Sequence, residues 1–222
     1  MKLKSFGCSF IFGSELSDDG KNGPYAVGSR LTWPALSAQR LGFDYQCYAK
    51  PGSGNFQLME RVLEQTTNIE PALYVIGWTW IDRFDYIDES ADPWPGSKWN
   101  TIMPIDDTDL ARTYYKKLHS EYQDKLRSLT AIRVTIDTLK SKNLPFIMTY
   151  MDDLIFETKW HHTPAIAELQ NYVKPYMTLF NEKTFLEWSR ENKFLESEYW
   201  HPLEDAHIAA ANYMLELGVH KV

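Results

Sequence analysis

The chain opens with Lys2-Leu-Lys-Ser-Phe-Gly-Cys-Ser-Phe-Ile-Phe-Gly13, and this stretch decides how the rest is interpreted. A short apolar run from Leu3 leads to Gly7 and Ser9, which is the pattern of a buried strand that ends in a tight turn. In an open α/β sheet, ligands bind beyond the carboxyl ends of the strands. Ser9 would then place its hydroxyl in a crevice beside backbone N–H groups, two of the parts that acyl transfer needs. A serine that only caps the next segment gives the same short pattern.

Size and composition favour one globular domain. The 222 residues are 44% hydrophobic and 14% aromatic, enough for a substantial core and too apolar for a disordered chain. A net charge of −7 argues against nucleic acid as a partner. We read no signal peptide and no apolar run of bilayer length, so we expect a cytoplasmic protein without a membrane partner. The cysteines, Cys8 and Cys47, form neither a metal spacing nor a disulfide framework.

Strands and helices alternate in the first third of the sequence. Residues 43–49 and 72–77 have the pattern of a second and a third strand, and helical spacing precedes each of them. This order predicts a three-layer α/β/α sandwich with a central, mostly parallel sheet, of the flavodoxin-like kind. A fourth strand is expected at 146–150, and a fifth around 178–180 or 185–188 completes a five-stranded sheet.

Residues 80–106 interrupt this order. They include Trp80, Trp94 and Trp99 and show no periodicity. A segment of this length without regular spacing is either functional or disordered, and the aromatic content argues against disorder. We therefore expect a single domain of residues 1–222 with an aromatic-rich insertion, which either forms a rim over the crevice or packs on its own tryptophans.

The second chemically informative segment is Glu198-Tyr-Trp-His201-Pro, just before the last helical run. The proline keeps His201 extended and outside that helix. Glu198 is close enough in sequence to turn back toward the imidazole. Serine, histidine and carboxylate are the parts of a nucleophilic triad, in which the histidine takes the serine proton and the carboxylate orients the histidine. His161 and His162 lack a third ligand at helical spacing, so we predict no metal site there. A serine mechanism of this kind needs no cofactor, and we expect none.

The order and spacing of these blocks resemble the SGNH (GDSL-like) hydrolases over nearly the whole chain. The segment around Ser9 resembles the Gly-Asp-Ser block of that family, with cysteine in place of aspartate. The segment that ends at His201 resembles its Asp-x-x-His-Pro block, with glutamate in place of aspartate. Gly52 and Asn55 lie in a stretch that looks like the second block. Thr79 stands in the third block, where the family has an asparagine.

The resemblance implies a serine esterase that works through an acyl-enzyme. Its catalytic residues would be Ser9, His201 and Glu198, and its oxyanion hole would be formed by Ser9, Gly52 and Thr79. The implied substrate is an ester, and an O-acetyl ester of a carbohydrate or another small molecule is our first choice because sugar rings stack on tryptophan. The expected substrate contacts are Asn55, Trp78 and Trp80.

One departure from the family pattern keeps other functions open. The Thr79 hydroxyl is shorter than an asparagine amide and has one donor where the amide has two. Losing an oxyanion donor typically lowers turnover by about 10²–10³. A weak or inactive module that binds a glycan or another partner on the same fold therefore remains an alternative, as does an O-acyltransferase. The sequence does not predict an oligomeric state.

Overall fold

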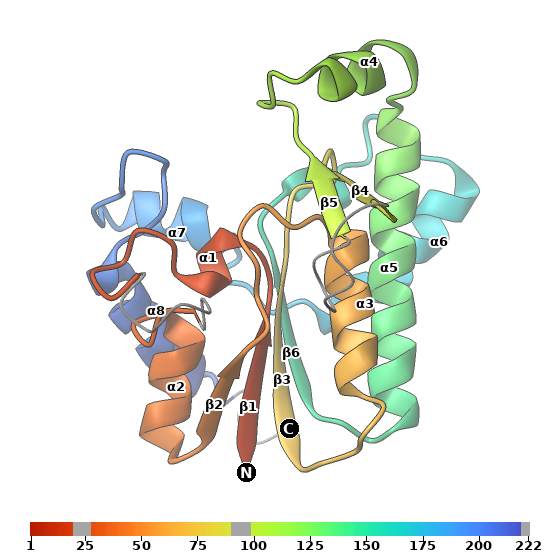
Figure 1. The fold of residues 1–222 in the computed structure, drawn as a ribbon. Coiled ribbons are helices and arrows are strands. Elements are labelled where there is room, and N and C mark those ends of the chain that lie inside the picture. Colours follow the sequence, from red (N-terminus) through yellow and green to blue (C-terminus); the bar gives the residue numbers. More distant parts are fainter. Residues whose placement is uncertain (20–27, 90–98, 219–222) are drawn as a thin grey trace.

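A parallel sheet forms the centre of the protein. The computed structural model describes residues 1–19, 28–89 and 99–218, and in these ranges the main sheet has four strands in the order β2, β1, β3, β6. Every neighbouring pair in it is parallel. The strands are β1 (Lys2–Phe6), β2 (Asp44–Cys47), β3 (Ala72–Trp78) and β6 (Phe146–Tyr150). Helices cover both faces, which confirms the predicted three-layer α/β/α sandwich (Figure 1).

Different helices pack on the two faces of the sheet. Alternate residues of β3 supply the two cores, because successive side chains of a strand point to opposite faces. Leu73 and Val75 belong to one core, and Tyr74 and Ile76 to the other. Burial on both faces explains why the sequence of β3 is continuously apolar. The first core packs against α2 (Trp33–Leu41) and α8 (Glu204–Glu216), and the second against α3 (Asn55–Gln65), α5 (Glu121–Ser141) and α6 (Pro164–Val173).

The prediction of a fifth strand in the main sheet is wrong for the described residues. After the short 3-10 helix η2 (Lys174–Tyr176), Met177 makes a single parallel bridge to β6. The chain then turns at Asn181 and Glu182, both of which have positive φ. The other candidate segment is helix α7 (Phe185–Glu191), which starts in a capping box. Local turn and capping interactions therefore override the apolar composition that indicated a strand.

Residues 108–141 form two helices. The first is α4 (Asp109–Lys117), and the Thr108 hydroxyl caps it by accepting the N–H of Ala111. Ser120 caps the second, α5, by accepting the N–H of Gln123. A polar N-cap within a stretch of helical spacing thus begins a new helix, a break that periodicity alone does not reveal.

The expected insertion contains a second, smaller sheet. β4 (Phe84–Ile87) and β5 (Trp99–Ile102) pair in antiparallel fashion, while residues 90–98, including Trp94, lie outside the described residues. The Asp85 carboxylate of β4 accepts the backbone N–H groups of Gly54 and Gln57 at 3.0 and 2.9 Å. The insertion thereby supplies the N-terminal cap of α3, whose own cap position is a glycine. That residues 1–222 form one domain with this insertion stays a prediction.

Two features complete the description. A short 3-10 helix, η1 (Asp153–Ile155), follows β6. None of the helices in the described ranges combines the length and the apolar character that crossing a bilayer requires.

Candidate active site

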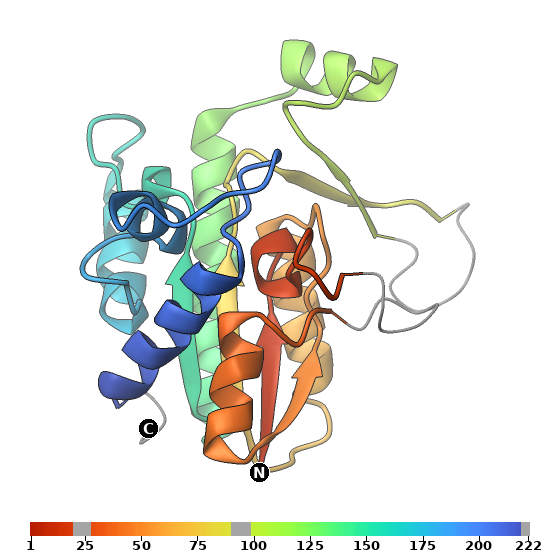
Figure 2. The same ribbon diagram turned by 90° about the vertical axis from the view of Figure 1, so that its left-hand side faces the viewer.

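The two informative segments of the sequence meet beyond the carboxyl end of β1 (Figure 2). Ser9 is the first residue of α1 (Ser9–Phe12), and His201 lies in the loop before α8. The distance from Ser9 Oγ to His201 Nε2 is 2.8 Å, a hydrogen bond between residues 192 positions apart. Ser9 is 9% exposed, so its hydroxyl is mostly shielded but reachable. The structure therefore brings the predicted serine and histidine into direct contact.

Close packing places Ser9 at this point. The chain passes from β1 to α1 within two residues, and Ile11 of α1 then packs on the two neighbouring strand ends. A Cβ at Gly7 would lie 2.6 Å from Ile11 Cγ1, and a Cβ at Gly77 would lie 2.7 Å from the same atom. Both positions need glycine for space. The short helix ends at Gly13, whose φ of 83° requires glycine for conformation.

The carboxylate beside His201 is Glu15, which corrects the expectation that Glu198 would hold it. His201 Nδ1 is 2.6 Å from Glu15 Oε2. Glu198 is exposed and lies in a tight turn in which the N–H of Trp200 donates to the Ser197 carbonyl at 3.1 Å. Trp200 has a φ of 63° in this turn. The turn breaks the helical i to i+3 relation that would have put Glu198 on the same side as His201, and Glu198 instead lines the cleft described below.

Ser197 connects the same groups. Its hydroxyl donates to Glu15 Oε2, and its Oγ accepts the backbone N–H of His201 at 3.1 Å. Burial acts to raise the pKa of the Glu15 carboxyl, but hydrogen bonds with His201 and Ser197 outweigh it, and the pKa is lowered from its ordinary value. Glu15 is therefore ionised at neutral pH and can keep the Nδ1 proton of His201 in place, which leaves Nε2 to accept from Ser9.

Two backbone N–H groups face the same space. The Ser9 N–H is at the start of α1, where helical amides have no partner inside the helix. Gly52 lies in the turn before α3 and has a φ of 77°. Among the described residues, neither N–H donates a hydrogen bond to another protein group. Both residues line one cleft with His201, the arrangement that binding of a developing oxyanion requires.

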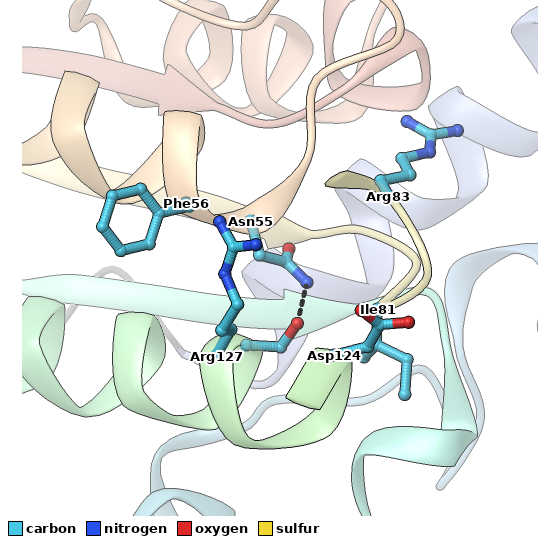
Figure 3. Close-up of a pocket in the computed structure, with 7 residues that line it drawn as sticks. Asn55, Phe56, Ile81, Arg83, Asp124 and Arg127 are labelled. Carbon is cyan, nitrogen blue, oxygen red and sulfur yellow. Dashed lines mark hydrogen bonds between the residues drawn. The ribbon is translucent and has the colours of Figure 1, made fainter. Parts of the chain in front are cut away.

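Thr79 and Asn55 are used internally and do not line this cleft. The Thr79 N–H donates to Asn55 Oδ1 at 2.8 Å, and Asn55 Nδ2 donates to the Thr79 carbonyl at 3.0 Å. Asn55 Nδ2 also donates to Ser128 Oγ (Figure 3). The Thr79 hydroxyl is fully buried, and no partner is found for it among the described residues. The expected oxyanion role of Thr79 and the expected substrate contact of Asn55 are therefore not supported by their positions.

The two tryptophans predicted to contact substrate have different positions. Trp78 is completely buried in the core against α3 and α5, because it is the last residue of β3 and points into that face. Trp80 lines the cleft and packs against Phe10, with the ring centroids 5.5 Å apart. Of the pair, only Trp80 is placed to meet a ligand.

The cleft has a volume of about 710 Å³. Besides Ser9, Gly52 and His201, its walls are largely apolar and aromatic, and the exposed rings of Tyr199 and Trp200 stand at the rim. Charged residues are also present. They are Asp82, Arg83, Arg190 and Glu198. A space of this kind suits a ring-bearing or partly apolar molecule much larger than an acetyl group.

His207 connects the two helices α8 and α2 next to the site. It lies in α8, is 2% exposed, and accepts the N–H of Trp33 on Nδ1 at 3.1 Å. Burial lowers its pKa to about 3, so the ring is neutral and can serve as an acceptor at the start of α2. It thereby ties α8, which follows the His201 loop, to α2.

Comparison with known proteins gives structural matches only. No family model and no curated protein matches the sequence. The psychrotrophic esterase EstA from Pseudoalteromonas sp. aligns with a TM-score of 0.51 at 8% identity, over 97% of this chain and 94% of that chain. A catalytic mutant of an acetylxylan esterase from Geobacillus stearothermophilus aligns with a TM-score of 0.51 at 16% identity, over 97% and 92%. A lipolytic protein of the G-D-S-L family from Desulfitobacterium hafniense gives 0.48 at 12% identity, over 97% and 98%.

These matches concern the fold. At such low identities, a similar backbone shows a shared architecture and leaves the chemistry to the residues present. The resemblance to SGNH (GDSL-like) hydrolases, predicted from spaced sequence blocks, is thus confirmed as a resemblance of fold. The solved structures that it resembles include esterases.

Sequence reasoning missed Glu15 and Ser197. Glu15 lies in a stretch whose composition indicates only a surface loop, and it reaches His201 because its own φ is 67°. A backbone conformation of this kind is uncommon for glutamate and has no sequence signature. Ser197 could have been noticed as the residue next to Glu198, but only the turn geometry gives it two partners in the site.

Proposed function

We propose that the protein is a serine esterase in which Ser9 is the nucleophile, His201 the general base and Glu15 the carboxylate that orients His201. The observation that carries this proposal is the continuous hydrogen-bonded series from Ser9 Oγ to His201 to Glu15, at 2.8 and 2.6 Å. A hydroxyl next to a base that is itself held by a third group is the general signature of an activated nucleophile.

The proposed reaction has two stages. His201 Nε2 takes the Ser9 proton as Oγ attacks the ester carbonyl, and the N–H groups of Ser9 and Gly52 stabilise the oxyanion. The imidazolium then protonates the leaving alcohol, which leaves an acyl group on Ser9. Water, deprotonated by the same imidazole, attacks the acyl carbon, and the imidazolium returns this proton to Ser9 Oγ as the acid is released. Glu15, ionised at neutral pH, stabilises the imidazolium in both stages.

The preferred substrate is an O-acetyl ester of a carbohydrate or another small ring-bearing alcohol. Trp80, Tyr199 and Trp200 give the cleft aromatic surfaces on which such rings can stack. An acetylxylan esterase among the structures with the same fold is consistent with this choice. Binding without turnover remains the second candidate, because Thr79 does not replace the missing oxyanion asparagine and the hole has two backbone donors.

Labelling with a fluorophosphonate probe, together with hydrolysis of 4-nitrophenyl acetate and acetylated xylo-oligosaccharides, tests the proposal. We expect Ser9→Ala to abolish labelling and to lower kcat by a factor on the order of 10⁴ or more. Ser14→Ala is the matched control, since Ser14 lines the same cleft and has no contact with His201 among the described residues. Persistent labelling of the Ser9→Ala protein would remove Ser9 from the mechanism, and absence of hydrolysis with intact sugar binding would favour the second candidate.

A further inference from the structure

Arg83 is held against the wall of the cleft that contains Ser9 and Gly52. Its guanidinium carbon lies 4.8 Å from the centre of the Trp80 ring. One of its nitrogens donates to the Ser53 carbonyl at 3.0 Å, next to Gly52. Figure 3 shows its side chain directed away from Asn55 and Arg127. A stacking contact and a hydrogen bond therefore fix a long cationic side chain that would otherwise be free to move.

The other arginines near the cleft have their charge or their donors occupied. Arg190 binds Glu196 through two nitrogens, at 2.9 and 3.1 Å. Arg61, behind the Gly52 turn, donates to the Tyr48 carbonyl and to the side chains of Ser53 and Gln57. For Arg83, no carboxylate of residues 1–19, 28–89 or 99–218 comes within 4 Å, although Asp82 lines the same cleft. A guanidinium has five N–H donors in a fixed fork, and the hydrogen bond from Arg83 to the Ser53 carbonyl uses one nitrogen.

We propose that Arg83 forms an anion subsite, so that the preferred ester carries a carboxylate, sulfate or phosphate group on its alcohol part. This inference rests on the proposed esterase function and specifies its substrate. The cleft is much larger than an acetyl group, so most of it receives the alcohol part. A planar, pre-positioned guanidinium pairs with two oxygens of such a group. Because the chain carries a net charge of −7, a local cation is also what an anionic substrate needs in order to approach.

The subsite is measured with two acetyl esters that differ in charge through a single methyl group, 4-acetoxybenzoate and its methyl ester. Their intrinsic reactivities cancel when the ratio of the two kcat/KM values is compared between proteins. We expect Arg83→Gln to lower the anionic-to-neutral ratio about tenfold, Arg83→Lys to lower it less, and 0.5 M salt to lower it in the wild type. Arg190→Gln is the control, because it removes the same charge from the same cleft but from a guanidinium already paired with Glu196. An unchanged ratio in Arg83→Gln would overturn the proposal.

A binding measurement separates this proposal from the esterase function. Calorimetric titration of the Ser9→Ala protein with 4-hydroxybenzoate and with its methyl ester requires no turnover. We expect the anion to bind about tenfold more tightly, and Arg83→Gln in the same background to remove the preference. Equal affinities for the two compounds in the Ser9→Ala protein would reject the anion subsite even if the wild type hydrolyses esters. A preference that depends on Arg83 would support the subsite even if the wild type hydrolyses neither.

Discussion

The chain segments that carry Ser9 and Thr79 follow neighbouring parallel strands, β1 and β3, yet their polar groups are used in opposite ways. At the end of β1, Ser9 opens onto the cleft and bonds His201. At the end of β3, Thr79 turns inward and exchanges two hydrogen bonds with Asn55. The difference lies in the backbone after each strand, because only two residues separate helix α1 from β1, while no helix follows directly after β3 at Thr79 and Trp80. A polar residue at a strand end thus joins a site only if the next turn exposes it.

After the loss of Ser9, replacing the carboxylates Glu15 and Glu198 one at a time is expected to have the largest effect. In Glu15→Gln, the amide can donate to Nδ1 and favour the wrong tautomer of His201, so we expect kcat for 4-nitrophenyl acetate to fall by about 10³–10⁴. Glu198→Gln should change kcat far less, since Glu198 makes no hydrogen bond to His201 in the described structure. A larger loss in Glu198→Gln than in Glu15→Gln would restore the triad expected from sequence.

The next-largest effect is expected at Gly52, whose backbone N–H is proposed to bind the oxyanion. Gly52→Ala strains a backbone at φ 77° and is expected to displace its N–H, lowering kcat by about 10². Gly42→Ala is a matched control, because Gly42 has a φ of 67°, has no atoms within 4 Å of a new Cβ, and ends α2 away from the cleft. Both variants should lose about 1–2 kcal/mol of stability, measured by urea unfolding, but only Gly52→Ala should lose turnover. Equal turnover in the two proteins would remove Gly52 from the oxyanion hole.

Smaller effects, on stability and not on turnover, are expected at the Thr79 side. Asn55→Ala leaves the backbone N–H and carbonyl of Thr79 without partners and should cost about 1–3 kcal/mol in unfolding free energy. Thr79→Val replaces a buried hydroxyl that has no partner among the described residues, so it should keep or slightly raise stability and leave kcat unchanged. If Thr79→Val instead lowered kcat by about 10², the threonine would be an oxyanion donor after all.

The smallest effect is a dependence of stability on pH through His207. Its pKa is about 3 when folded and near the ordinary 6.5 when unfolded, so the unfolded chain binds a proton that the folded one does not. The stability of the fold that depends on a neutral His207 ring is present above pH 6.5 and is lost as the pH falls from 6.5 toward 3. Between pH 7.5 and 5.5 we expect a loss of about 1 kcal/mol that His207→Asn, which keeps an oxygen acceptor for Trp33, does not show. The unfolding free energies of both proteins are measured by urea denaturation at the two pH values. An equal change in the wild type and in His207→Asn would contradict this prediction.

Local patterns in the sequence predicted the elements whose causes are local. The apolar run of β3, predicted at residues 72–77, is an example whose signal lies within the strand itself. The pairing of Ser9 with His201 was also predictable, because both stand in short blocks at strand or helix ends. The resemblance of those blocks to a known fold then placed them at one edge of the sheet.

The missed features depend on contacts between distant segments. Glu15 reaches His201 across 186 positions of sequence and through a left-handed backbone conformation. The stretch around Glu15 has the composition of a surface loop, and neither feature can be inferred from it. Asn55 and Thr79 have the residue types of an active site, and only the fold shows that they satisfy each other. Trp78 and Trp80 are two positions apart, yet the end of β3 comes between them and gives them different environments.

The cap that Asp85 places on α3 joins the insertion to the turn that carries Gly52. Thr101 of the neighbouring strand also donates to this carboxylate, at 2.7 Å, and a side chain at Gly54 would collide with it. A deletion that removes Asp85 or the strand that carries it would therefore uncap α3 and loosen the turn that carries Gly52. Redesign of this fold should treat the small sheet and that turn as one module, to be exchanged together or left alone.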